Sequence, residues 1–239
     1  MSLDSLAAPL DLIAITYFFL AIGIYRLIVS RAGLERRSLT GAVQQQRLRW
    51  MLNMAGRDNR TIDTILLGNL GQGNAFFAST SAIAVGGLTA TLGSGAERLQ
   101  YLLDALPLTM QATPVVWAAK QLLIMGIFVY AFFKFAWAFR LSHYASIMIG
   151  ATPEPGATDA EARQDHAERT ARLVGLAAEH ANSGIRSFYH AMAALAWFFH
   201  PLLFMLATTW VILILARRDF FSRSLRLIAG RRAKSSTTS

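Results

Sequence analysis

The sequence contains no cysteine, and this absence excludes several kinds of chemistry. Without thiols the chain forms no disulfide, holds no zinc or iron–sulfur cluster through sulfur, and offers no cysteine nucleophile. It also lacks a Ser–His–acid set, an HExxH motif, a P-loop and a carboxylate pair, and no dinucleotide fingerprint follows the Gly-x-Gly at Gly71–Gly73. These absences predict a protein that is not an enzyme and that binds neither a metal nor a cofactor.

Charged residues are scarce as well: they make up 15% of the chain, against about 25% in an ordinary soluble protein. Hydrophobic residues reach 54% and gather in long runs, which is typical of an integral membrane protein. The net charge of +9 comes from basic residues that flank these runs. Membrane orientation and attraction to anionic lipids explain that charge more simply than nucleic acid does, so membrane lipids are the predicted partners.

The apolar runs predict an all-α membrane bundle of four transmembrane helices, over about residues 9–29, 65–92, 114–139 and 189–216. They form one membrane domain, residues 1–220, and a basic low-complexity tail follows at 221–239. Short amphipathic helices are expected in the connections. Of these, the helix at 38–56 either lies in the membrane interface or packs on the protein itself. Pro201 predicts a kink near the middle of the fourth span.

The second span is rich in small and polar residues, which predicts an inner helix against which the other spans pack. Gly68, Gly73 and Gly86 are the small positions that would let helices approach closely. The span also carries the amides of Asn69, Gln72 and Asn74. These amides suit either interhelical hydrogen bonds or a polar path between spans, and packing is the preferred interpretation.

Lys120 is an ionisable residue about 9 Å inside the third span by helical rise. A charged side chain at such a depth needs a partner or a water-filled cavity, so it is a functional candidate by default. Asp104 or Glu97 is the predicted partner, provided that the 93–112 segment folds back. Since the third span runs back across the membrane, Lys120 and the amides of the second span are not expected to form one site.

Basic and aromatic residues at the span ends indicate contacts with lipid headgroups. Lys and Arg there extend toward the interface, where Trp and Tyr are also enriched. The candidates for contacts with lipid phosphate are Lys134, Arg140, Arg186 and His190.

His200 precedes Pro201 deep in the fourth span, where its ring N–H would satisfy a carbonyl freed by the kink. Ligation of a b-type haem by His200 with His143 or His190 is the alternative, because imidazole is a usual axial ligand. His143 and His190 lie near the membrane edge and His200 does not, so the sequence favours no haem.

Blocks of the sequence resemble a family of uncharacterised multi-spanning membrane proteins from bacteria and plants, classified as a domain of unknown function. The resemblance rests on FFASTS, KFAW and AWFFHP within residues 10–220, and it does not include the insert at 154–170 or the Ser/Thr-rich tail. It implies a helical inner-membrane protein of about four spans. It implies no activity, cofactor or site residue.

The acidic N-terminus and the eight arginines between residues 26 and 60 predict a periplasmic N-terminus in a bacterial inner membrane. Four spans then place the C-terminal tail in the periplasm too, although its seven basic residues argue against this. The preferred function is that of a structural or accessory subunit in a larger membrane assembly, with other membrane subunits as partners. The alternative is a small transporter or channel, with a polar path between the second, third and fourth spans lined by Asn69, Gln72, Lys120 and His200.

Overall fold

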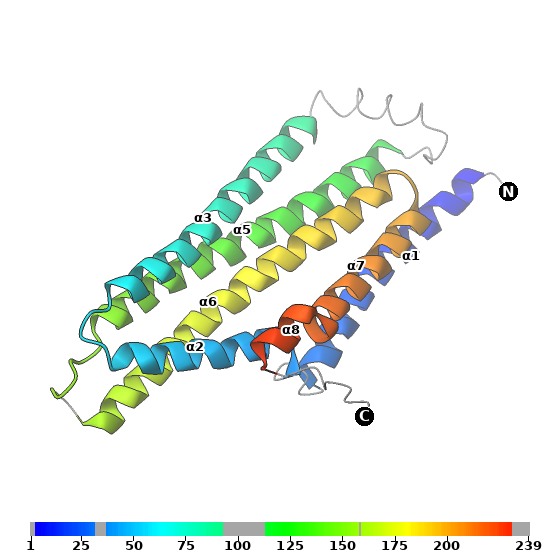
Figure 1. The fold of residues 1–239 in the computed structure, drawn as a ribbon. Helices are drawn as coiled ribbons and strands as arrows, with labels where there is room; N and C mark the ends of the chain where they lie inside the picture. The colour runs from blue at the N-terminus through cyan, green and yellow to red at the C-terminus, as the bar shows by residue number, and fades with distance from the viewer. Residues whose placement is uncertain (1–2, 32–36, 93–112, 158, 231–239) are drawn as a thin grey trace, which may run out of the picture. The chain divides into compact units, whose positions relative to one another are not determined.

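The computed structural model describes residues 3–31, 37–92, 113–157 and 159–230, and these contain helices and no strand. The helices are α1 (Leu3–Arg31), α2 (Leu39–Ala55), α3 (Thr61–Ala90), α5 (Pro114–Gly150), α6 (Ala160–Leu195), the 3-10 helix η3 (Ala196–Phe198), α7 (Pro201–Phe221) and α8 (Arg223–Ile228) (Figure 1). The predicted all-α class is therefore confirmed.

Three stretches are long and apolar enough to cross a membrane: Pro9–Ser30, Pro114–Gly150 and Pro201–Ile228. They agree with the prediction of a membrane protein. Helix α3 is not among them. The count of four spans therefore stays a prediction.

The stretch 189–216 is not one kinked helix, and that prediction is corrected. Helix α6 ends at Leu195, and α7 begins only at Pro201. The Phe18 ring lies 6.0 Å from the His190 ring and 5.1 Å from the Phe204 ring, whereas a straight helix would separate those two residues by about 21 Å. The chain therefore reverses here (Figure 1). Pro201 occupies the first turn of α7, where its missing N–H costs little.

The chain divides into two compact units, each built from several segments. The first unit holds Met1–Tyr25, Gly73–Trp137 and His180–Leu213. The second holds Arg26–Gln72, Ala138–Glu179 and Ile214–Ser239. Each unit has a hydrophobic core of its own.

Aromatic rings fill the core of the first unit. Phe18, Ile124, Trp197 and Phe204 are buried together, and the rings of Trp197 and Phe204 stack at 5.1 Å. A second cluster forms around Phe135, where α5 and α6 approach closely at Gly184. A Cβ added to Gly184 would lie 2.6 Å from the Phe135 ring, so only glycine fits here without a shift.

The core of the second unit includes one face of α2. Met51 and Met54 are fully buried against residues of α3, α5 and α6, and Trp50 packs beside them. This helix therefore packs on the protein itself. Its location in the membrane interface stays a prediction. The short helix α8 also lies against α2, where the Gln46 amide donates to the carbonyl of Ile228 at 3.1 Å.

Helix α3 is not the inner helix that its composition predicted. Large apolar side chains on it are exposed, including Ile62, Phe76 and Ile83. A Cβ added to Gly68, Gly73 or Gly86 would meet no atom within 4 Å, so these glycines mark no close approach. Close packing occurs at Gly71, where an added Cβ would lie 3.3 Å from the Cβ of Ser142. The remaining buried positions of α3 form one stripe: Asp63, Leu67, Ala78 and Ser81.

Candidate functional site

A buried ion pair in the first unit is the strongest candidate for a functional site. The Nζ of Lys120 lies 3.6 Å from Oδ1 of Asp11, and their side chains are 3% and 14% exposed. The same carboxylate oxygen accepts the indole N–H of Trp197 at 2.6 Å. Lys120 Nζ also lies 5.5 Å from the centre of the Trp197 ring, within the range of a cation–π contact.

Three elements bring these side chains together. Asp11 lies in the first half of α1, Lys120 in the second turn of α5, and Trp197 in the 3-10 helix at the chain reversal. The reversal is what directs the Trp197 indole toward Asp11, because a continuous helix would carry it away from α1. Asp11 and Lys120 both lie within apolar stretches that are candidates for spanning a membrane.

Attraction between the two charges stabilises the pair, whereas their removal from water disfavours it. Removing a carboxylate and an ammonium from water is costly, and only good geometry with further hydrogen bonds compensates. The indole N–H of Trp197 supplies one such bond to Asp11. An ammonium has three N–H groups, and Asp11 is the acid that pairs with it among the described residues. The arrangement thus concentrates opposite charges in an apolar surrounding.

The observed partner of Lys120 differs from the predicted one. Asp104 and Glu97 lie outside the described residues, and Asp11 makes the ion pair instead. The sequence carried a signal for this pairing that the prediction did not use: an acid and a base near the ends of two apolar runs. Trp197, 186 residues from Asp11, gave no such signal.

Two further polar side chains of α5 are buried beside this pair. Trp117 is 4% exposed and packs edge-on against Phe198 at 4.7 Å. Gln121 is 1% exposed, and its amide donates to the hydroxyl of Thr91 at 3.2 Å. With Lys120 they occupy positions i, i+3 and i+4, which share one face of a helix.

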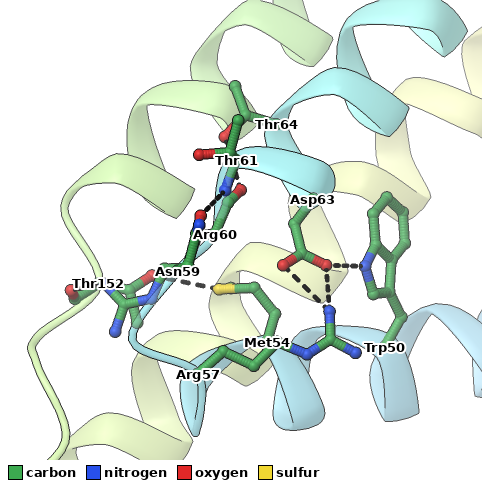
Figure 2. Close-up of polar contacts among 9 residues, drawn as sticks. All are labelled: Trp50, Met54, Arg57, Asn59, Arg60, Thr61, Asp63, Thr64 and Thr152. Atoms are coloured by element: carbon green, nitrogen blue, oxygen red, sulfur yellow. Dashed lines mark hydrogen bonds and ion pairs between the residues drawn. The ribbon is translucent and has the colours of Figure 1, made fainter.

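A second buried acid, Asp63, belongs to the other unit. Figure 2 shows its polar contacts. It accepts the indole N–H of Trp50 at 2.6 Å, and Arg57 donates to both its oxygens at 2.8 and 3.1 Å. The nearby Arg60 guanidinium donates to the backbone carbonyls of Thr152 and Pro153. These bonds join α2, α3 and the α5–α6 connection, which is a structural role.

The three amides of α3 differ in their surroundings. Asn69 and Gln72 are exposed and belong to the second unit, while Asn74 is half-buried in the first. Asn69 borders a shallow apolar hollow of about 400 Å³, together with Trp50, Leu66 and Leu70. None of the three amides makes a hydrogen bond to the described part of the chain.

His200 accepts a hydrogen bond from the backbone, whereas the sequence predicted that it donates one. Its Nδ1 accepts the backbone N–H of Leu202 at 3.1 Å, so the ring caps the N-terminus of α7 and does not donate to a freed carbonyl. His143 lies in the other unit, where its Nδ1 is 3.2 Å from the carbonyl of Phe139. The described residues contain no cluster of three His, Asp or Glu suited to a metal ion.

The four lipid-phosphate candidates differ in their surroundings. Lys134 lies over the Tyr130 ring at 5.3 Å, and Arg140 donates to the Tyr144 hydroxyl at 3.0 Å. Arg140 is exposed, whereas Lys134, Arg186 and His190 are half-buried. The His190 ring faces the core residue Phe18.

A protein-family model described as "Protein of unknown function, DUF599" matches residues 13–224 of the chain. The chain belongs to the DUF599 family. The expected resemblance to an uncharacterised family is thereby confirmed. No curated protein and no solved structure matches the chain. The DUF599 match includes Trp117, Lys120, Gln121 and Trp197 but begins two residues after Asp11, and the family description assigns no activity to any of them.

Proposed function

We propose that this DUF599 protein is a non-enzymatic protein of the bacterial inner membrane that serves as a structural or accessory subunit of a larger membrane assembly. Its partners in this proposal are other membrane protein subunits and lipids, and it needs no cofactor. The observation that carries the proposal is the exposed face of α3.

That face combines amides with apolar side chains in a way that suits a protein neighbour. Asn69, Gln72 and Phe76 are spaced i, i+3 and i+7, so they share one side of the helix, and all three are exposed. Asn69 lies about 12 Å from the start of α3 by helical rise. An amide that faces hydrocarbon without a partner is unfavourable, whereas amides and small residues on a helix favour association with another helix.

The test is site-specific photo-crosslinking of the full chain in native membranes. A photoreactive amino acid at Phe76, which is 67% exposed, is expected to capture a membrane neighbour. Leu206 on α7 is the matched control, since it is 66% exposed in the same unit but lies on another helix. Asn69→Leu with Gln72→Leu is expected to abolish the Phe76 crosslink. Equal capture from both positions, or a protein that purifies as a lone monomer without a crosslink, would contradict the proposal.

A second candidate function is transport of a small solute, which the buried Asp11–Lys120 pair favours. Intramembrane ionisable residues commonly mark substrate or ion pathways. The predicted path loses support at Asn69 and Gln72, which are exposed and belong to the other unit. Solute uptake by proteoliposomes that is lost on Lys120→Ala would favour transport. Absence of flux in the wild-type protein would eliminate it.

A further inference from the structure

Beside Lys120, two buried polar atoms have no partner among the described residues. They are the indole nitrogen of Trp117, a donor, and the amide oxygen of Gln121, an acceptor. Both side chains are at least nine-tenths buried, and they lie one turn apart on the same face of α5. Buried polar groups in native proteins nearly always have a partner, so each unpaired atom calls for an explanation.

The orientation of the Gln121 amide is fixed by its neighbour. The hydroxyl of Thr91 donates to the backbone carbonyl of Leu88 at 2.9 Å, so its oxygen is left to accept. It accepts from the Gln121 amide nitrogen at 3.2 Å. The unpaired atom of Gln121 is therefore its oxygen, and a flipped amide would lose the bond to Thr91.

Neither Asp11 nor Lys120 forms a hydrogen bond with the Trp117 indole nitrogen or the Gln121 amide oxygen. Oδ1 of Asp11 already accepts from Trp197 and faces Lys120. The Lys120 ammonium keeps N–H groups beyond the one directed at Asp11, because it carries three. On this face of α5, the indole N–H of Trp117 and the remaining N–H groups of Lys120 thus still need an acceptor. The amide oxygen of Gln121 still needs a donor.

We propose that Trp117, Lys120 and Gln121 form an internal binding site for a single hydroxyl group, supplied by water or by a lipid headgroup. A hydroxyl both accepts and donates, so it takes the N–H of Trp117 or Lys120 and gives its proton to Gln121. A carboxylate or phosphate has no proton for Gln121 and would add negative charge beside Asp11. An ammonium group cannot accept from Trp117. The site goes beyond the proposed function and is independent of any assembly.

Indole NMR of the full chain in phosphatidylcholine nanodiscs tests the site, because this headgroup has no hydroxyl. The chain contains five tryptophans, and Trp117→Phe assigns the Trp117 signal. A cross-peak between water and the Trp117 indole proton is expected. Trp197 is the internal control: its indole N–H donates to Asp11, so no water cross-peak is expected.

The same measurement in phosphatidylglycerol nanodiscs separates the two sources of the hydroxyl. A water ligand leaves the cross-peak unchanged, whereas a lipid hydroxyl shifts the Trp117 signal and replaces the water cross-peak. Gln121→Leu is expected to abolish the cross-peak or the shift while the Trp197 signal stays in place. If that variant misfolds, as a displaced Trp197 signal would show, the wild-type spectra decide alone. A Trp117 indole that contacts neither water nor lipid overturns the proposal, as does a cross-peak that persists in correctly folded Gln121→Leu.

Discussion

Asp11 and Asp63 are held in the same way, although they belong to different units. Each accepts an indole N–H at 2.6 Å and each faces a basic side chain. The two pairs differ in solvent access: the Lys120 side chain is 3% exposed, whereas that of Arg57 is 48% exposed. Water screens the second pair and not the first, so loss of one charge should cost more at Asp11.

Removing one member of the buried pair leaves the other charge uncompensated. Asp11→Asn, which keeps an acceptor for Trp197, and Lys120→Met are each expected to lower the free energy of unfolding by about 3–5 kcal/mol. The double variant should lose less than either single variant, because it buries no charge. Unfolding in mixed micelles measures all three. Arg169→Gln is the control, since its pair with Asp165 is exposed and should matter by less than about 0.5 kcal/mol.

At the scale of elements, the sequence predicts which segments form helices, but it does not predict how those helices pack. Long apolar runs specify helices in a membrane whatever their neighbours, so α1 and α5 follow from sequence. The same small and polar residues are used for contacts inside a protein and between proteins, so composition could not tell that α3 is exposed. A proline within an apolar run likewise indicates either a kink or the first turn of a new helix. The Phe18 contacts decide for the second at Pro201.

The packing of α5 on α6 depends on the missing side chain at Gly184. Gly184→Ala is expected to destabilise the protein by about 1–3 kcal/mol, because the added Cβ meets the fully buried Phe135 ring. Gly86→Ala is the matched control: its Cβ meets nothing, and alanine favours a helix over glycine by about 1 kcal/mol. Unfolding of both variants in the same micelles measures the contrast. Equal effects would show that the approach at Gly184 is not tight.

For the whole molecule, contacts within the second unit constrain the path through the membrane. Helix α8 lies against α2, and Arg60 binds the carbonyls of Thr152 and Pro153. From these contacts we infer that the first connection, the α5–α6 connection and the C-terminal helix lie on one side of the membrane. Four spans would place α8 opposite α2, so that count conflicts with the contact. Crossings by α1, α3, α5, α6 and α7 satisfy it, because the chain reversal returns α7 to the side from which α6 came.

This path also explains the basic C-terminal tail, whose charge argued against the four-span topology. All but four of the 23 basic residues lie in segments 26–60, 140–172 and 217–234, and the path puts these segments on one side. The positive-inside rule predicts that this side is the cytoplasm, which agrees with the prediction of a periplasmic N-terminus from the sequence. The four exceptions are Arg98, Lys120, Lys134 and Arg186.

Single cysteines test the path directly, because the natural chain has none. Asp58→Cys and Glu154→Cys, both at exposed positions, should react with a membrane-impermeant maleimide in inverted vesicles and not in spheroplasts. Thr113→Cys, at the other end of α5, should show the opposite pattern, because a helix of 37 residues is about 55 Å long and exceeds the membrane thickness. Ser222→Cys, just before α8, separates the two counts. If Ser222→Cys reacts from the same side as Asp58→Cys, the chain crosses the membrane five times. If it reacts from the same side as Thr113→Cys, the count of four spans is restored.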